Sequence, residues 1–437
     1  MPTMKDMVIN IFKRKSATGV VAWNMASQIV GKVLGAGATF LATLLIARAY
    51  SAEGYGDFIK ITTYVALFYS FADFGLNAIY LQQSQQPQVK NAWASLLGLR
   101  LLGSIFLIFA ALSVLAFVPT GVTQGYTPLV RVGIIIFSPA IIFQTLLTSA
   151  NAVFQKSLRY DFSTLAVGSG AAITLILLWL VTSWLGGASG VLLSVVSFLG
   201  GSAVTAVVAL GLARRLTGTL RFSFRTPELL KIFVPAIPLG LAILFNLVYF
   251  HVDSVILALT RSTLEVGIYG LAYKVFEVSL VLPTFFMNTV YPLQLAASGK
   301  SEAERREFRK LFFRSLYFLS LASLFSLLVF WAAAPLLTLV RSDFALSIPA
   351  LRVLALGLPL FFISALLFWT LIAVGRQTLL LVIYGIAMVV NILSNLVFIP
   401  RYGYMAAAWI TVASEGLVLL MLIGFLHRIL KPIFYAN

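Results

Sequence analysis

The sequence predicts an all-α membrane protein of about 12 transmembrane helices with both termini in the cytoplasm. Of its 437 residues, 60% are hydrophobic and only 10% are charged, a balance that leaves too little polar surface to cover a soluble core. Apolar runs of about 20 residues, the length that crosses ~30 Å of hydrocarbon, recur along the whole chain. The basic residues between these runs are concentrated on alternate connections, as expected for a chain that crosses the membrane repeatedly.

The first span follows a basic segment, residues 1–19, and its apolar stretch continues to residue 49. That stretch is too long for a cleaved signal peptide, so we expect an uncleaved first helix preceded by a short interfacial segment. Hydrophobic runs and their polar, Pro or Gly breaks then predict the twelve spans. The spans cover residues 20–48, 56–81, 92–117, 129–154, 162–184, 188–213, 230–258, 265–296, 311–340, 348–374, 378–399 and 404–428.

The distribution of positive charge predicts the orientation. With the N-terminus inside, most lysines and arginines lie on the cytoplasmic side, which satisfies the positive-inside rule. The opposite side receives six arginines, namely Arg48, Arg131, Arg261, Arg341, Arg352 and Arg401. A net charge of +17 would also suit nucleic acid. However, short basic clusters between apolar runs are typical of loops beside anionic membrane lipid, so we expect no nucleic-acid partner.

The remaining composition argues against an enzyme. The chain has no cysteine and only two histidines, His251 and His427, which lie far apart, so we expect no disulfide, no metal site and no cysteine nucleophile. The segments outside the spans are too short to fold into a catalytic domain. A membrane transporter is the better hypothesis.

A duplication is indicated near the middle of the chain. A shift of 214 residues aligns Tyr55-Gly56 with Tyr269-Gly270 and Lys60 with Lys274, just after the first and seventh spans. Six spans separate the copies, so both halves would have the same orientation, related by an axis along the membrane normal. We therefore expect an N-terminal six-helix lobe at residues 1–213, a cytoplasmic linker at 214–229 and a C-terminal six-helix lobe at 230–437.

Four cations lie inside predicted spans, where each costs ~2.5–3.5 kcal/mol or more. Lys32 is roughly 18 Å into the first span, at 1.5 Å per residue, and has no carboxylate three or four residues away. Asn24 and Gln28 lie on the same helical face, which makes this stripe polar. These observations predict a cationic cavity that binds an anionic, phosphate-bearing substrate. Its predicted substrate-binding residues are Asn24, Gln28, Lys32, Lys60, Arg100 and Lys274.

Buried carboxylates provide candidates for coupling transport to an ion gradient. They are Asp73, Asp253, Glu277 and Glu415, and the sequence does not rank H⁺ against Na⁺. Structural roles stay open for several of these charges. Lys60 could extend to the headgroups, Lys274 and Glu277 could pair on one helix face, and Asp253 could pair with a neighbouring helix.

Several short motifs carry a family resemblance. They are Ile46-Ala47-Arg48, Glu53-Gly54-Tyr55-Gly56, Phe71-Ala72-Asp73-Phe74-Gly75-Leu76, Asp253-Ser254-Val255-Ile256-Leu257, Glu265-Val266-Gly267-Ile268-Tyr269, Ala272-Tyr273-Lys274 and Ile399-Pro400-Arg401-Tyr402-Gly403-Tyr404. In these motifs, and in their order along the chain, the sequence resembles the polysaccharide-type flippases of the multidrug/oligosaccharidyl-lipid/polysaccharide exporter superfamily.

The resemblance implies two six-helix lobes in a V around a central cavity. It also implies that the protein moves an undecaprenyl-diphosphate-linked oligosaccharide from the inner to the outer leaflet of the bacterial plasma (inner) membrane. Basic residues of the first, second and eighth helices would face the diphosphate, which matches Lys32, Lys60 and Lys274. A glycan polymerase and a chain-length regulator would be its protein partners. The glycan route stays open among O-antigen, capsule, exopolysaccharide and teichoic acid.

Three alternatives remain. A cation-coupled multidrug exporter of the same superfamily would prefer an acidic cavity. A membrane-bound glycan polymerase or ligase would share the substrate but is expected to carry a long external loop. A lipid-binding scaffold would leave the buried charges without a use.

Overall fold

A computed structural model describes residues 17–71, 73–84, 92–121, 125–297 and 301–434, and this part of the chain is helical without any strand. The first half contains α2 (Ala17–Ala49), α3 (Ala52–Phe71), α4 (Leu76–Gln83), α5 (Ala92–Phe117), α6 (Pro128–Phe137), α7 (Ala140–Lys156), α8 (Tyr160–Trp184) and α9 (Gly187–Thr217). The second half contains α10 (Thr226–Thr260), α11 (Thr263–Ser279), α12 (Val281–Ala296), α13 (Glu302–Ala333), η1 (Ala334–Leu336), α14 (Leu337–Val340), η2 (Ser342–Leu346), α15 (Ser347–Leu356), α16 (Leu358–Ala373), α17 (Gln377–Tyr402) and α18 (Tyr404–Phe434).

Within the described residues, 12 helical stretches are long and apolar enough to cross a membrane. This confirms the predicted count of twelve spans. Hydropathy predicts the count for a physical reason. Backbone polar groups in hydrocarbon must be satisfied within each segment, so an apolar run of this length folds as a helix.

Several spans consist of two consecutive helices, and the breaks fall at similar places in both halves. The second and eighth spans break between α3 and α4 and between α11 and α12, while the fourth and tenth break before α7 and before α16. In the second span, Phe74 (φ 38°) and Gly75 (φ 72°) adopt left-handed backbone that no α-helix continues. The seventh span behaves differently, because α10 stays helical through Pro235 and Pro238.

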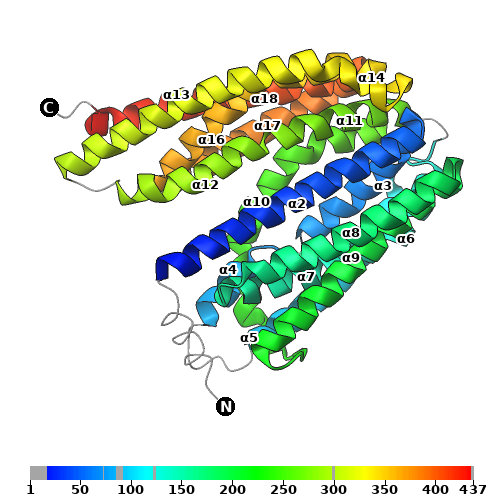
Figure 1. The fold of residues 1–437 in the computed structure, drawn as a ribbon, viewed down its shortest axis with the longest axis horizontal. Helices are drawn as coiled ribbons and strands as arrows, with labels where there is room; N and C mark the ends of the chain where they lie inside the picture. The colour runs from blue at the N-terminus through cyan, green and yellow to red at the C-terminus, as the bar shows by residue number, and fades with distance from the viewer. Residues whose placement is uncertain (1–16, 72, 85–91, 122–124, 298–300, 435–437) are drawn as a thin grey trace. The chain divides into compact units, whose positions relative to one another are not determined.

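The chain forms two compact units. Unit 1 comprises residues 1–50, 60–118 and 126–244, and unit 2 comprises residues 51–59, 119–125 and 245–437. The long helices of both units are visible in Figure 1. The units are not the same ranges as the expected lobes, because α10 is divided at Leu244 and the first turns of α3 belong to unit 2. The division at residues 214–229 stays a prediction.

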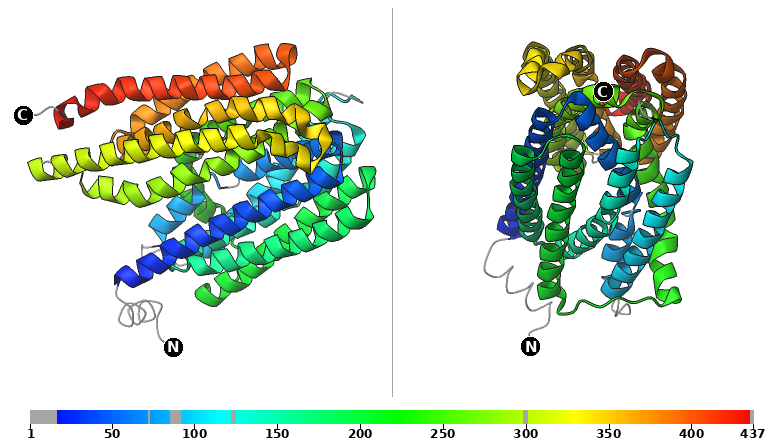
Figure 2. Two further views of the ribbon diagram at one scale, coloured as in Figure 1. Left: turned by 45° about the horizontal axis from the view of Figure 1, so that its top comes forward. Right: turned by 90° about the vertical axis from the view of Figure 1, so that its right-hand side faces the viewer.

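In unit 1, α8 and α9 run side by side as an antiparallel pair (Figures 1 and 2). Their closest approach is built from two glycines. A Cβ on Gly170 would lie 2.5 Å from the Gly201 carbonyl oxygen, and a Cβ on Gly201 would lie 2.7 Å from the Gly170 carbonyl oxygen. Such backbone contact supplies the van der Waals packing that holds helices together in lipid.

A second core of unit 1 joins α4, α5, α7, α9 and α10. Its fully buried members include Leu96, Phe154, Ala209 and Ala236. The segment between α9 and α10 is fixed to this core, because the Ser223 N–H donates to the Ala94 carbonyl of α5 at 2.8 Å. The predicted linker is therefore packed against unit 1 rather than extended.

In unit 2, α11 packs against the first turns of α3 through another glycine pair. A Cβ on Gly56 would strike the Thr263 carbonyl oxygen, and a Cβ on Gly267 would strike the Ala52 carbonyl oxygen. The contact is reciprocal, with Ala52 and Gly56 on one helix matching Thr263 and Gly267 on the other.

Helix α13 begins earlier than the predicted span 311–340. Ser301 and Glu304 form a capping box at its first turn, with the Ser301 Oγ accepting from the Glu304 N–H at 3.3 Å and the Glu304 carboxylate accepting from the Ser301 N–H at 2.9 Å. The helix then continues through the basic run that the sequence places in a cytoplasmic loop. Phe308 and Phe312 are buried on one face, while Lys310 and Arg314 are exposed.

Candidate functional site

Lys32 lies on α2 with its side chain exposed, and Gln28, one turn earlier, is half-buried. Among the described residues, the Lys32 ammonium has no ion pair. The neighbours Val33 and Leu34 are about half exposed, so this stretch of α2 does not face a packed core. The side chain of Asn24 lies outside the described residues. Among the described residues, Lys32 is thus an exposed cation near the middle of α2 that forms no ion pair.

Lys60 lies in α3 and differs from Lys32 in being fully buried. It is not a free charge, because it interacts with neighbouring groups. An anion could reach Lys60 only after the packing around it had changed.

Arg100 of α5 is also fully buried, and its partners come from three segments of unit 1. Its Nη2 lies 2.8 Å from Asp73 Oδ1 and donates to Asn77 Oδ1 at 2.9 Å, and its Nη1 donates to Ser149 Oγ of α7 at 3.4 Å. Asp73 belongs to the break between α3 and α4. Two predicted site residues therefore neutralise each other, and the guanidinium holds the broken second span against α5 and α7.

Lys274 and Glu277 of α11 form an ion pair, with 2.6 Å between Lys274 Nζ and Glu277 Oε2. Both side chains are partly exposed. The pairing along one helix face agrees with the structural alternative that their i, i+3 spacing left open.

Asp253 is buried in unit 2 and accepts hydrogen bonds from three elements. The Tyr269 hydroxyl of α11 donates to Asp253 Oδ2 at 2.5 Å, and the Thr411 hydroxyl of α18 lies 3.4 Å from the same oxygen. The Ser254 N–H donates to Oδ1 at 2.6 Å. No basic side chain forms an ion pair with Asp253 among the described residues. A buried carboxylate with hydroxyl neighbours can bind a proton or a hard cation.

Glu415 of α18 lies one turn further along the same helix contact. It is buried, and the Tyr249 hydroxyl of α10 donates to its Oε2 at 3.2 Å. Tyr249 and Asp253 are four residues apart on α10, as Thr411 and Glu415 are on α18. The two candidate carboxylates therefore occupy successive levels of one antiparallel contact.

Sequence reasoning missed the polar partners of these carboxylates. Tyr249, Tyr269 and Thr411 approach from helices far apart in the sequence, so no local pattern marks them. A further buried pair lies on α17, where Asn391 Nδ2 donates to Ser414 Oγ at 2.9 Å and Asn395 Nδ2 donates to Asn391 Oδ1 at 2.9 Å. The i, i+4 spacing of two asparagines in an apolar span was the available signal for this pair.

Unit 1 contains a cavity of about 240 Å³ between α2, α7, α8 and α9. Its lining includes four hydroxyl side chains, each of which donates to the carbonyl four residues earlier on its own helix: Thr39, Thr174, Ser202 and Thr205. None of the predicted site residues lines this cavity. Within the described residues, no group of three His, Cys, Asp or Glu side chains is placed to hold a metal ion.

Known proteins share this fold over nearly its whole length. A structure of the lipid II flippase MurJ in an inward closed conformation has a TM-score of 0.72 at 16% identity and covers 92% of this chain and 87% of its own. An inward-facing multidrug resistance MATE family transporter of the MOP superfamily has a TM-score of 0.72 at 12% identity, covering 93% of this chain and 98% of its own. A MOP superfamily transporter from Pyrococcus furiosus, described as having a binding pocket of reverse polarity, has a TM-score of 0.63 at 12% identity, covering 95% and 96%.

Two sequence families match parts of the chain. The chain matches no curated protein sequence. The MatE family matches residues 238–397. The family described as polysaccharide biosynthesis protein matches residues 21–297, which is more than half of the chain. The chain belongs to the polysaccharide biosynthesis protein family.

Proposed function

We propose that this protein is a flippase, a transporter rather than an enzyme. It moves an undecaprenyl-diphosphate-linked oligosaccharide from the inner to the outer leaflet of the bacterial plasma membrane. The family match supports a role in polysaccharide biosynthesis, and the fold is shared with a flippase and with exporters. The glycan and the diphosphate cannot cross hydrocarbon unaided, whereas a prenyl chain can stay in lipid. A glycan polymerase and a chain-length regulator are the proposed protein partners.

The observation that carries the proposal is the accessible ammonium of Lys32. A lysine exposed to lipid at this depth would cost ~2.5–3.5 kcal/mol, so we infer that its side chain faces a site that admits water and an anion. A diphosphate fits that need, because each phosphate oxygen accepts charge-assisted hydrogen bonds. We assign Lys32 the primary substrate contact. Lys60, whose charge is buried, and Lys274, which is already paired, are secondary contacts that require rearrangement.

Substitution of Lys32 tests the proposal directly. Lys32→Ala, reconstituted into proteoliposomes with a labelled undecaprenyl-diphosphate oligosaccharide, should lose at least about tenfold in flipping rate, the loss expected for one charge-assisted contact. Lys32→Arg should keep most of the rate. Arg48→Ala is the matched control, because Arg48 is an exposed cation at the end of the same helix. Wild-type flipping by Lys32→Ala at normal protein levels would refute the assignment.

We further propose that cation binding at Asp253 and Glu415 drives the transport cycle. Both carboxylates are buried without a basic ion-pair partner among the described residues, and each is shared between α10 and α18. A cation bound there would alter the contact between these helices, and a ligand changes a conformational equilibrium only through such differential binding. Asp253→Asn should therefore remove the dependence of flipping on an imposed H⁺ or Na⁺ gradient.

A multidrug exporter is the second candidate, favoured by the match of the MatE family to residues 238–397. A cationic drug would need an accessible carboxylate rather than an accessible lysine. The same proteoliposomes distinguish the two functions, since an exporter would transport a cationic dye and would not require Lys32.

A further inference from the structure

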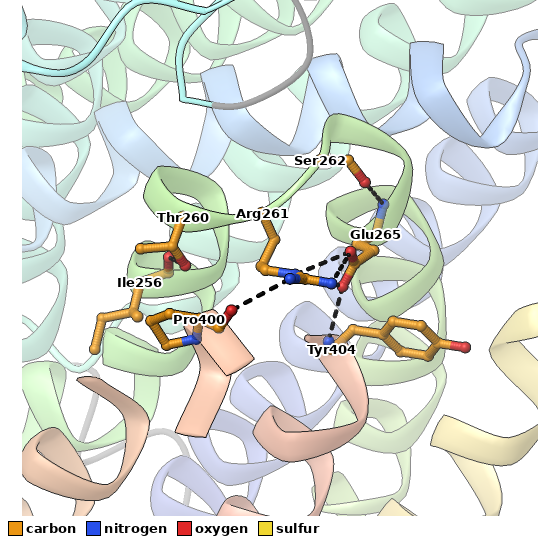
Figure 3. Close-up of polar contacts among 7 residues, drawn as sticks. All are labelled: Ile256, Thr260, Arg261, Ser262, Glu265, Pro400 and Tyr404. Atoms are coloured by element: carbon orange, nitrogen blue, oxygen red, sulfur yellow. Dashed lines mark hydrogen bonds and ion pairs between the residues drawn. The ribbon is translucent and has the colours of Figure 1, made fainter. Parts of the chain in front are cut away.

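The Arg261–Glu265 pair links the end of α10 to two of the sequence motifs of unit 2, Glu265–Tyr269 and Ile399–Tyr404 (Figure 3). Arg261 Nη2 lies 2.8 Å from Glu265 Oε1, and Arg261 Nε donates to Glu265 Oε1 and Oε2 at 3.0 and 3.1 Å. Arg261 Nη1 also donates to the Pro400 carbonyl at 3.3 Å. The Tyr404 N–H donates to Glu265 Oε2 at 3.1 Å. We call these four residues, Arg261, Glu265, Pro400 and Tyr404, the polar clamp.

The polar clamp joins the ends of α10 and α17 to the starts of α11 and α18. Tyr404 is the first residue of α18, so its N–H has no partner within the helix, and a carboxylate there also complements the helix dipole. Ser262 Oγ accepts from the Glu265 N–H at 3.2 Å, which holds the start of α11. Gly403, between α17 and α18, has φ 67°, and a Cβ at this position would strike Glu265 Oε2. Only glycine meets both requirements.

Three of the helices that meet at the polar clamp, α10, α11 and α18, also surround Asp253. Asp253 lies two turns before Arg261 on α10, Tyr269 lies one turn after Glu265 on α11, and Thr411 lies two turns after Tyr404 on α18. Spacings of four, seven and eight residues return to nearly the same side of a helix.

The register between α10 and α18 is regular from the polar clamp to Asp253. A Cβ on Gly403 would lie 3.1 Å from Arg261 Nη2, and two turns further in, Thr411 lies 3.4 Å from Asp253. A step of eight residues along α10 is thus matched by a step of eight along α18. A shift of either helix at the clamp would therefore displace Thr411 from the Asp253 carboxylate.

The first half of the chain supplies an internal comparison. Arg48 and Glu53 lie at the junction between the first and second spans, as Arg261 and Glu265 lie at the junction between the seventh and eighth, and both Arg48 and Glu53 are exposed. Helices α2 and α9, the first and last spans of that half, contain no Asp or Glu. The buried carboxylate and the polar clamp occur together in the second half.

We propose that the polar clamp positions the Asp253 carboxylate and its hydroxyl neighbours for the coupling cation, an inference that rests on the proposed coupling role of Asp253. Arg261 and Glu265 are positioning residues, since they lie two turns away and touch no transported group. The titratable groups that surround Asp253 are His251, Tyr269 and Tyr273, and the clamp acts on their geometry through α10 and α11.

Cation dependence provides the test. Flipping by full-length protein in proteoliposomes is measured against Na⁺ concentration at fixed pH, and against pH without Na⁺. Glu265→Ala should raise the half-saturating concentration of the coupling cation about tenfold, the usual effect of losing a group that orients a ligand. The maximal rate at saturating cation should change much less. Glu265→Gln, which can still accept from the Tyr404 N–H, should restore part of the affinity.

Arg341→Ala is the matched control. Arg341 pairs with Asp343 at 2.9 Å in unit 2, but Arg341 precedes the short η2 segment and Asp343 lies within it, so this pair joins no two of α10, α11 and α18. It should keep the wild-type half-saturating concentration. The inference is overturned if Glu265→Ala keeps that concentration too, or if its rate falls equally at every cation concentration.

A second measurement reports on helix register without transport. The chain has no cysteine, so nitroxide labels can be placed on Leu264→Cys of α11 and Trp409→Cys of α18, both exposed positions. Glu265→Ala should broaden or shift the distance between the labels, and an unchanged distribution would refute the clamp. If wild-type flipping shows no cation dependence, or Asp253→Asn leaves it intact, the proposed coupling fails, while the label distances still decide whether the clamp sets the register.

Discussion

Arg100 carries its charge inside unit 1, where its side chain is 0% exposed while that of Asp73 is 40% exposed. A guanidinium in this position is tolerated because the Asp73 carboxylate, the Asn77 amide and the Ser149 hydroxyl accept its hydrogen bonds. Asp73 lies in a stretch where Phe74 and Gly75 interrupt the helix, so the charge pair also determines where α3 ends and α4 begins. Removal of the carboxylate would leave a cation with no compensation.

Asp73→Asn should therefore destabilise unit 1 by about 3 kcal/mol, at the low end of the range for a broken buried pair because Asp73 is partly exposed. Thermal unfolding in detergent measures this change. The double variant Arg100→Met/Asp73→Asn should recover much of the loss, since it leaves no unpaired charge. Arg159→Met, which breaks a partly exposed pair with Asp161, should cost at most about 1 kcal/mol. Equal losses from Asp73→Asn and Arg159→Met would contradict this account.

Glu228 lies before the apolar part of α10, and its carboxylate accepts from Ser223 Oγ at 2.8 Å and from Ser95 Oγ at 2.9 Å. These hydrogen bonds, that from Ser223 first, lower the pKa of Glu228 from its ordinary value of 4.5, and the positive charges of Arg225 and Lys231 lower it further. A carboxyl whose folded-state pKa is depressed stabilises the fold above its unfolded pKa. That stabilisation is lost as the pH falls through the folded-state pKa.

Glu228→Gln should therefore be less stable than wild type at neutral pH, and the difference should shrink and then vanish as the pH falls through the lowered pKa of Glu228. The melting temperatures of both proteins in detergent, compared at each pH, isolate this contribution from general acid unfolding. A difference that stays constant across that range would show that the charge of Glu228 does not contribute.

At the scale of helices, the glycine contact between α3 and α11 illustrates what local sequence could predict. The sequence comparison at a shift of 214 aligns Gly56 with Gly270, yet the reciprocal contact joins Gly56 with Gly267, one turn away. Packing requires two glycines that face each other, whereas an alignment of short motifs follows side-chain identity. The sequence predicts a duplication, but it does not predict which two glycines make this contact.

Gly267→Ala tests the importance of that contact. Its Cβ would strike the Ala52 carbonyl oxygen, a backbone atom that cannot rotate away, so we expect a loss of about 1–3 kcal/mol through overpacking. Gly385→Ala in α17 is the matched control, because a Cβ there meets no atom within 4 Å. That control should be neutral or slightly stabilising, since alanine favours the helix. Comparable unfolding midpoints for the two variants would argue against close packing of α3 on α11.

The broken spans show where Pro and Gly residues predict a break in a membrane helix and where they do not. Pro139 and the Gly357–Pro359 stretch do fall where the fourth and tenth spans divide, as a missing N–H or a fixed φ would favour. However, α10 stays helical through Pro235 and Pro238, and the second span breaks at Phe74 without any proline. Tertiary contacts decide these cases, since Phe74 stacks on Phe233 of α10 at 5.9 Å. Membrane helices can replace lost backbone bonds with neighbouring groups.

At the scale of the whole molecule, hydropathy was sufficient for the span count because each span satisfies its backbone locally. The candidate site was less predictable, because pairing between helices is a tertiary property. Lys32 could be identified, since an unpaired cation in an apolar run is visible in the sequence. The neutralisation of Arg100 by Asp73, 27 residues away, and the approach of Thr411 to Asp253, 158 residues away, could not be.

Orientation is the remaining whole-molecule property, and cysteine labelling tests it. The native chain has no cysteine, so a single introduced thiol reports its position without background. Thr219→Cys lies between α9 and α10 beside basic residues, and Gly186→Cys lies between α8 and α9; both positions are exposed. If the positive-inside rule sets the topology, a membrane-impermeant maleimide should label Gly186→Cys in intact spheroplasts and Thr219→Cys only in inside-out vesicles. The reverse pattern would put the basic segments outside. Loop charge could not then be the determinant of orientation.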